Sequence, residues 1–441
     1  MKHLLLLLAI ILFSSKLLAK ETTSILIKGG NDSKILINIK NITGKDLSSF
    51  NLSYKIKKRV KEQLEDTQLF TIKNLTPKEL FKKQSLIKEF SSEFFKEKPV
   101  YSELTVLLNS ENNNMISAKV ILFDLFTKEN IIAENISFPK KFWHRGAAQI
   151  SDLIYQHYTG LAGYINTRLV FISERGSLFF RSKKVAFMDL YGDNIKYVTD
   201  GNDLVLTPRL SPDAQNIVYI SYKSGFPILY KLNLTTEETE KLFDSEQMIY
   251  APRFSQDGKM LVLASSYEGN SEIITYDIIK KRKKRLTNNY AIDTSPDFSP
   301  DGKKIVFSSD RTGAQKLYLI DIDGKNLQEI NLGPGNYATP NWSPDGKYIA
   351  FTKIHRGKFH IGILNMHNFE IKILTKSYKD EAPTWAPNSK FIIFSRKKAT
   401  NDNLKTGTAK LIMVNLNGQI VKTIDTPYDA SEADWVKISE E

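Results

Sequence analysis

The sequence of 441 residues contains no cysteine, and this absence excludes several classes of protein. Without cysteine there is no disulfide scaffold, thiol nucleophile, iron–sulfur cluster, cysteine-ligated zinc or lipid-modified terminal cysteine. Histidine is also scarce, with six residues and no His-Glu-x-x-His motif. No Gly-x-Ser-x-Gly nucleophile motif, phosphate-binding loop or dinucleotide-binding glycine pattern occurs. We therefore expect no metal, no cofactor and no standard catalytic motif.

Long apolar runs are equally rare, and the clearest one lies at the N-terminus. An unbroken apolar run from Leu4 to Phe13 follows a basic start and precedes a small residue, Ala19. A membrane span needs roughly 20 apolar residues, whereas this pattern is typical of a secretory signal peptide. We expect residues 1–19 to be a cleaved signal and the mature chain to be exported, with no stable membrane insertion. An uncleaved anchor is the alternative, because Leu17 is large where cleavage sites favour small residues.

Charge is not concentrated in one part of the chain. The formal net charge of +13 comes from 62 basic and 49 acidic residues, and the excess is spread over both halves. A nucleic-acid-binding module would gather it on one domain, so we expect no nucleic acid partner. The densest run, Lys280 to Arg285, is interpreted as a solvated hairpin turn, with contact to phosphates or anionic lipid as the alternative.

An internal repeat organises the second half of the chain. The segment Pro-Asp-Phe-Ser-Pro-Asp-Gly-Lys at Pro296 recurs with substitutions at spacings of 44, 44, 44 and 43 residues, beginning at Pro208, Pro252, Pro340 and Pro383. A period of about 40–45 residues with several short strands per unit predicts a β-propeller. In the turn Ser299-Pro300-Asp301-Gly302, proline presets φ and glycine accepts a left-handed conformation. The turn aspartates are expected to cap the local backbone, not to bind metal: Asp213, Asp257, Asp301 and Asp345.

The number of blades follows from the two ends of the repeat region. Five units are complete, and a sixth opening strand near Trp435 has few residues after it. Residues of about 168–207 supply strands that lack an opening strand of their own. We therefore expect one shared blade, six blades in total and a propeller domain of residues 164–441.

The preceding residues 20–163 predict a smaller α/β domain. Helical spacing of apolar residues indicates helices over 48–65, 78–96 and 142–158, the last ending at Gly160. The expected strands are 25–28, 35–39, 103–108, 116–126 and 131–138.

The stretches just before the repeated prolines are candidates for binding. They carry tyrosine, amide and acidic groups and should ring one mouth of the central channel: residues 245–251, 288–295, 335–339 and 377–382. This composition suits recognition of a protein loop. His355, His360 and His367 lie on adjoining strands of one blade and are interpreted as ordinary strand and turn residues, with a functional cluster as the alternative.

The chain resembles the TolB family of periplasmic components of the Tol–Pal system. The Ser-Pro-Asp-Gly repeats, the junction segment 150–171 and the order of signal, α/β domain and six-bladed propeller are similar to this family; Ala148, where a histidine is expected, departs from it. The resemblance implies a non-catalytic periplasmic adaptor, a monomer within a hetero-complex. Its implied partners are the lipoprotein Pal at the propeller mouth, TolA at the N-terminal segment 20–33, and other outer-membrane or periplasmic proteins. Its implied role is outer-membrane integrity and constriction during cell division.

Carried over by position, the resemblance implies specific partner-binding residues. These are Met248, Ala251, Asp293 and Thr294, extended to the next loops by Ala338, Thr339, Asp380 and Glu381. Coupling between the two partners would need an N-terminal segment with two arrangements whose balance Pal shifts. A propeller enzyme or binding protein for a periplasmic sugar or peptide is the main alternative, with Asp293, Asp380 and Glu381 as its acids. Binding of an anionic polymer or lipid by the basic surface is a third reading.

Overall fold

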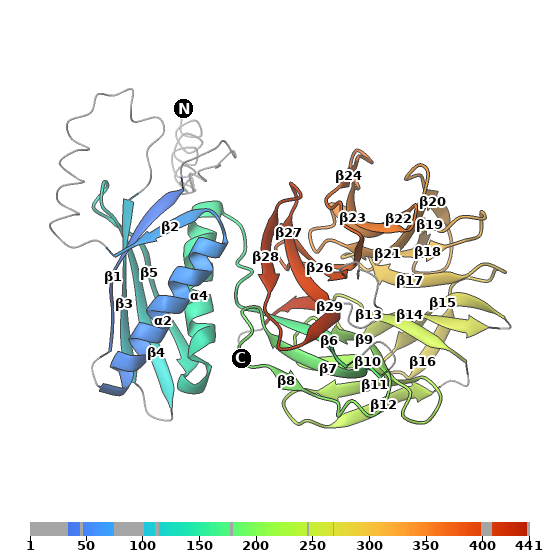
Figure 1. Cartoon of the computed structure of the whole chain (residues 1–441), viewed down its shortest axis with the longest axis horizontal. Helices are drawn as coiled ribbons and strands as arrows, with labels where there is room; N and C mark the ends of the chain where they lie inside the picture. Colours follow the sequence, from blue (N-terminus) through green and yellow to red (C-terminus); the bar gives the residue numbers. More distant parts are fainter. Residues whose placement is uncertain are drawn as a thin grey trace, which may run out of the picture.

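The computed structural model places two domains side by side (Figure 1). It describes residues 34–44, 47–74, 101–110, 114–176, 180–244, 247–267, 269–397 and 408–438. The expected signal peptide 1–19, the segment 20–33 with its strand 25–28, and the helix 78–96 lie outside the described residues. None of the helices within the described part of the chain is long and apolar enough to cross a membrane.

The N-terminal domain is a five-stranded mixed sheet covered on one face by two helices (Figure 1). The strand order is β2-β1-β3-β4-β5, with β1 parallel to both of its neighbours and the remaining pairs antiparallel. The elements are β1 (Ile35–Gly44), α2 (Leu47–Asp66), β2 (Phe70–Lys73), β3 (Tyr101–Ser110), β4 (Met115–Asp124), β5 (Asn130–Pro139), the 3₁₀ turn η2 (Lys140–Phe142) and α4 (Trp143–Thr159). The sequence patterns predicted these helices and strands, except for the four-residue β2.

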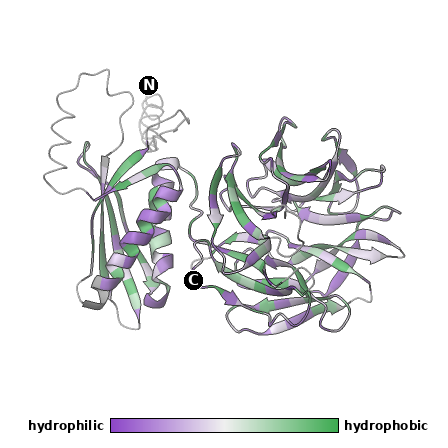
Figure 2. Ribbon diagram, viewed as in Figure 1, coloured by the Kyte–Doolittle hydropathy of each residue, from purple (hydrophilic) through white to green (hydrophobic). Residues whose placement is uncertain are grey.

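The helices form where apolar residues recur at helical spacing. Ile56, Val60 and Leu64 line one side of α2 and are fully buried against the sheet. Figure 2 shows hydrophilic residues on the outward side of this helix and apolar residues along the strands. Helix α4 ends where Gly160 adopts φ 66° and donates its N–H to the Gln156 carbonyl at 2.8 Å, the glycine stop that the sequence predicted.

The second domain is a β-propeller around a central channel. Within the described residues its strands make six four-stranded blades, two of which are joined by a single pair between Phe359 and Lys379. The first strands are β6 (Thr167–Arg175), β7 (Ser182–Asp189), β8 (Lys196–Tyr197), β9 (Val205–Leu210), β10 (Asn216–Ser221), β11 (Ile228–Asn233), β12 (Thr239–Asp244), β13 (Ile249–Phe254), β14 (Met260–Tyr267), β15 (Asn270–Asp277) and β16 (Arg282–Arg285). They are followed by β17 (Asp293–Phe298), β18 (Lys304–Ser309), β19 (Lys316–Asp321), β20 (Gln328–Ile330), β21 (Asn336–Trp342), β22 (Tyr348–His355), β23 (Lys358–Asn365), β24 (Ile371–Ile373), β25 (Lys379–Trp385), β26 (Phe391–Lys397), β27 (Ala409–Asn415), β28 (Ile420–Ile424) and β29 (Asp429–Lys437). This α/β domain followed by a propeller is the fold class that the repeat predicted.

One blade joins the two ends of the propeller. The C-terminal strand β29 pairs antiparallel with β6, which continues through β7 to β8. Trp435 on β29 donates its Nε1–H to the Thr167 hydroxyl at 2.7 Å. Because β29 covers the inner edge of β6, the two ends of the propeller share one blade and the ring is closed.

The repeated turns have the predicted local geometry. In the turn at Ser299, the Asp301 carboxylate accepts hydrogen bonds from the Ser299 hydroxyl at 2.6 Å and from the main-chain N–H two residues on at 3.1 Å. Gly302 has φ 69° and donates its N–H to the Ser299 carbonyl. Where glycine is replaced, Ala214 and Ser389 still adopt φ 57° and 58°. The weakened repeats therefore keep the same turn, at a modest cost in backbone strain.

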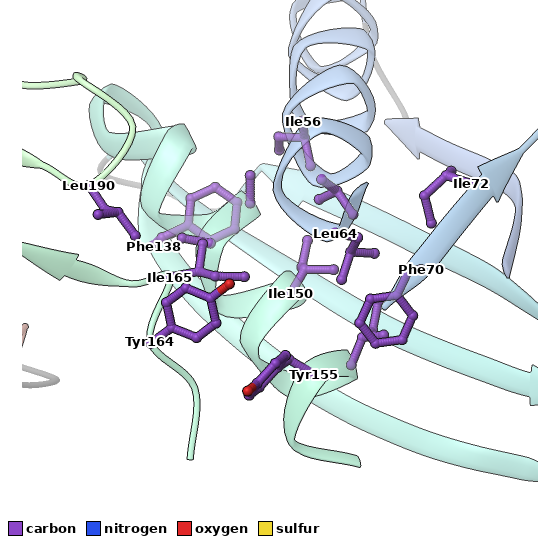
Figure 3. Close-up of a cluster of buried hydrophobic side chains, with 14 of the residues drawn as sticks. Ile56, Leu64, Phe70, Ile72, Phe138, Ile150, Tyr155, Tyr164, Ile165 and Leu190 are labelled. Atoms are coloured by element: carbon purple, nitrogen blue, oxygen red, sulfur yellow. The ribbon is translucent and has the colours of Figure 1, made fainter. Parts of the chain in front are cut away.

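A continuous apolar core connects the domains. Tyr164 is buried between them, with its ring centroid 4.4 Å from that of Phe391 and 6.3 Å from that of Trp435. Figure 3 shows Tyr164 in one cluster with Ile150 of α4. The half-buried Asp152 on α4 accepts the main-chain N–H groups of residues 165 and 166, both at 2.9 Å. The segment after α4 is thus held to the helix at the entrance to the propeller.

Asp152 is expected to make the stability of this junction depend on pH. Burial raises the pKa of its carboxyl to about 6, against the opposing effect of the two main-chain N–H donors. Between about pH 4 and 6 the folded chain therefore holds a proton that the unfolded chain has lost, so this contribution to stability falls as pH rises. Urea unfolding from pH 4 to 7 should show the free energy of unfolding of the wild type falling by about 2–3 kcal/mol relative to Asp152→Asn. A difference that is independent of pH, or that grows with pH, would contradict this assignment.

Candidate functional site

A cavity of about 280 Å³ opens at one end of the channel. Each of the six innermost strands contributes the residue before its repeated proline or the equivalent position: Thr207, Ala251, Ser295, Thr339, Ala382 and Glu432. The four expected channel-mouth stretches, the equivalent residue before Pro208 and the C-terminal strand therefore meet here. We call this space the mouth cavity.

The six residues share an unusual backbone conformation. Their φ angles lie between 47° and 56°, the left-handed region, and each sits beside a register shift in the innermost strand. A non-glycine residue in this region costs of order 1–3 kcal/mol, and such strain clusters at functional sites. A proline inside a strand pattern is a signal for such a bulge, so the repeated prolines could have predicted it. The bulges bend every inner strand at the same level of the channel.

The charged side chains of the mouth cavity are mostly paired. Glu381 lies 3.5 Å from the Lys379 ammonium and 3.1 Å from that of Lys397. Glu174 accepts a hydrogen bond from Arg181 at 2.7 Å. These carboxylates are neutralised locally, so the cavity presents little unbalanced acidity.

The predicted partner-binding residues lie at this end of the propeller, in three different settings. Met248 is 48% exposed beside the mouth. Ala251, Thr339 and Glu381 line the mouth cavity. Thr294 and Ala338 are half-buried in their strands.

The remaining two predicted residues are acids that are not free. Asp293 is fully buried, and Arg311 Nη2 donates to its two carboxylate oxygens at 2.9 and 2.8 Å. Asp380 is equally buried, with Arg396 donating from Nε at 2.7 Å and from Nη2 at 2.8 Å. The hydrogen bond to Asp380 raises the pKa of the Arg396 guanidinium. Asp293 binds the hairpin after β18 and Asp380 binds the paired strand β26, so neither presents a free carboxylate to a ligand.

The sequence reasoning missed most of an apolar rim around the cavity. Tyr290 is 100% exposed, and Ile292 beside it is also exposed. Successive strands of a blade run in opposite directions. The loop before the innermost strand and the hairpin between the second and third strands therefore lie at the same end of the propeller as Met248. The exposed large apolar residues there, called the mouth rim, are Phe180, Leu204, Phe226, Met248, Tyr290, Ile292, Tyr378 and Tyr428. The sequence did contain a signal for this rim, because Leu204 and Ile292 lie four residues before their repeated prolines, the same position that Met248 occupies.

Two other sequence features lie apart from this site. The run Lys280 to Arg285 is only in part a turn, because Arg282–Arg285 form the outermost strand β16. Here Lys281 pairs with Glu240 at 3.4 Å, and the Lys284 ammonium donates to main-chain carbonyls of the next blade. Partners on neighbouring strands therefore account for several of these charges.

Of the three histidines, only His367 is separated from the other two. His355 and His360 lie near the hairpin between β22 and β23, whereas His367 follows the opposite end of β23. Among the described residues, no group of three His, Asp or Glu side chains is arranged to hold a metal ion.

The fold and site define a class: a six-bladed β-propeller preceded by an α/β domain, with an apolar rim around one end of its channel. The family model of the TolB beta propeller domain (PD40) matches residues 155–439. The chain therefore belongs to the TolB family, as the repeats and the junction segment predicted.

Two curated relatives and one solved structure describe the extent of this similarity. The Tol-Pal system protein TolB of Roseobacter denitrificans is 39% identical over 125 residues, 28% of each chain. TolB of Paramagnetospirillum magneticum is 36% identical over 135 residues, 31% of this chain and 30% of the relative. The matched segments thus span less than a third of the relatives' length. The crystal structure of TolB from Acinetobacter baumannii has a TM-score of 0.76 at 22% identity and covers 92% of this chain and 97% of that one, which establishes the shared fold.

Proposed function

We propose that this chain is a non-catalytic periplasmic adaptor of a Tol–Pal system. Its propeller mouth binds the peptidoglycan-associated lipoprotein Pal, and its N-terminal segment 20–33 contacts TolA. In this role it supports outer-membrane integrity and constriction during cell division. The observation that carries the proposal is the mouth rim, a ring of exposed apolar side chains around a cavity on a chain of the TolB family.

The rim has the composition of a protein-binding surface. Gathering exposed tyrosine, phenylalanine and aliphatic side chains at one end leaves apolar area in water, and patches of this kind mark interaction sites. Aromatic residues around a central pocket are the usual hot spots of an interface, because they desolvate well when a partner fills the pocket. A loop of the partner would enter the mouth cavity while the rim packs around it.

The arrangement of the acids does not support the enzyme alternative. Asp293 and Asp380 are held in bidentate contacts with arginine, and Glu381 lies between two lysines. A general acid or base must reach a substrate proton, and it needs a pKa suited to that transfer. None of these three carboxylates is placed to do so, whereas a binding surface requires only the shape and polarity found here.

The test is calorimetric titration of the full chain with Pal lacking its lipid anchor. Met248→Glu combined with Ile292→Glu is expected to weaken binding about 100-fold or more, because hot-spot side chains each contribute about 2 kcal/mol or more. Thr294→Arg combined with Ala251→Arg, which fills the cavity instead, should have a similar effect.

The matched control is Ile279→Glu combined with Phe369→Glu. These side chains are also exposed and apolar, but they lie in hairpins at the opposite end of the blades. The control variant should bind as the unaltered chain does. Equal losses in both variants would refute the site, and no binding by the unaltered chain would refute the function.

A further inference from the structure

Two arginines lie between two cavities of the channel. Arg209 and Arg253 line both the mouth cavity and a second cavity of about 240 Å³, which lies toward the Ser-Pro-Asp-Gly turns at the other end. Each follows directly after a repeated proline on an innermost strand. We call this level the waist of the channel.

The carboxylates at the waist have all found partners. Asp434 accepts hydrogen bonds from Arg253 Nη1 at 2.7 Å and from the main-chain N–H of Leu210 at 3.0 Å. Asp297 accepts the Asn341 amide at 2.9 Å and the main-chain N–H of residue 342 at 2.7 Å. Both carboxylates therefore have hydrogen-bond partners without any ligand, and Arg253 has an anionic partner in Asp434.

Arg209 is the exception. It is only 7% exposed, and its Nη1 donates to two main-chain carbonyls, of Pro208 at 2.7 Å and of Glu432 at 3.2 Å. Its Nε is buried without an acceptor, and no carboxylate of the described residues forms a direct ion pair with it. The charges of Asp434, Glu432 and Asp297 act on it without direct contact. Burial, and after it the neighbouring Arg253 charge, lowers the pKa of Arg209 to about 10, so the group is still a cation at neutral pH.

A buried cation that lacks an anionic partner costs stability. Taking a charge out of water costs several kcal/mol unless an opposite charge and hydrogen bonds offset that cost. The two main-chain carbonyls that Arg209 contacts offset part of this cost but carry no full negative charge. An anionic ligand would supply that charge.

We propose that Arg209, with Arg253 beside it, binds one carboxylate group at the waist of the channel. The planar guanidinium fork matches a carboxylate in two parallel hydrogen bonds. The mouth cavity of about 280 Å³ admits a short acidic molecule or side chain but lies below the usual size of sites for larger ligands.

The carboxylate has two possible sources, a free small organic acid or an acidic side chain inserted by a protein. The test uses the full chain and no Pal, so its outcome is separate from that of the proposed function. Thermal unfolding is measured in millimolar succinate and in acetylated, amidated Gly-Glu-Gly, each against sodium chloride of equal ionic strength and, for the peptide, against Gly-Gln-Gly. A rise in Tm with succinate alone identifies a free acid, and a rise with the peptide identifies an inserted side chain.

Arg209→Met should abolish the rise in Tm with ligand, measured against its own Tm without ligand. Lys397→Met is the matched control, because it removes one positive charge from the wall of the same cavity and should keep the response. Arg209→Lys, which retains the charge but not the fork, should respond more weakly than the wild type. If neither probe raises Tm above the chloride control, or if Arg209→Met responds as the wild type does, the proposal is wrong.

Discussion

Asp293→Ala is expected to lower the free energy of unfolding by about 3–5 kcal/mol. The substitution leaves the Arg311 guanidinium, only 10% exposed, as a buried charge without its anion. Arg311 also donates from Nε to the Ser309 hydroxyl at 2.9 Å and lies over the Tyr318 ring at 4.7 Å, so packing prevents it from turning to solvent. The loss should appear as a lower denaturation midpoint in urea.

A double-mutant cycle separates the ion pair from simple truncation. Asp293→Ala combined with Arg311→Met should recover much of the lost stability, because neither charge then remains buried. Asp301→Ala is the matched control, since this turn aspartate is largely exposed and its replacement should cost about 1 kcal/mol. If the double variant is less stable than Asp293→Ala, the stabilising role of the pair is refuted.

Trp435→Ala is expected to lower the free energy of unfolding by about 3–5 kcal/mol, because it removes a large buried side chain. Trp435 is 4% exposed and packs in the core that joins the two domains. Its indole also bonds Thr167 at 2.7 Å, which ties the C-terminal strand β29 to β6. Removing the ring leaves a cavity at the closing seam of the propeller and weakens the contact with Tyr164.

Trp342→Ala provides the comparison. Trp342 occupies the equivalent position of a complete blade, is only half-buried and donates a longer bond to the Gly346 carbonyl at 3.3 Å. Its replacement should cost clearly less than that of Trp435. Equal losses measured by chemical unfolding would show that the closing seam has no special weight in the stability of the fold.

Much of the fold follows from local patterns. The buried faces of α2 and α4, the glycine stop at Gly160 and the repeated turns depend on residues a few positions apart, so they were predictable. Strand β2 was not, because its four residues become a strand only through parallel pairing with β1. The run Lys280 to Arg285 was interpreted as a turn for the same reason, since pairing of Arg282–Arg285 with β15 makes most of it a strand.

The site was predictable in position but not in chemistry. The repeat placed Met248, Ala251 and Asp293 at one end of the channel, because strand direction follows from the repeat itself. The burial of Asp293 depends on Arg311, which arrives from the following hairpin 18 residues later. A carboxylate next to a repeated proline looks the same in the sequence whether it faces a ligand or an arginine.

By itself the sequence determined the family, the propeller and which end of each blade lies at the mouth. These features follow from a repeat of about 44 residues and from turns whose residues are close together in the chain. Only the tertiary structure decided which charges at that level are neutralised. It paired Asp434 with Arg253 across blades that are 181 residues apart in the chain and left Arg209 without an anion. The physical reason is that electrostatic pairing depends on distances of a few ångströms between side chains, and closure of the ring sets those distances.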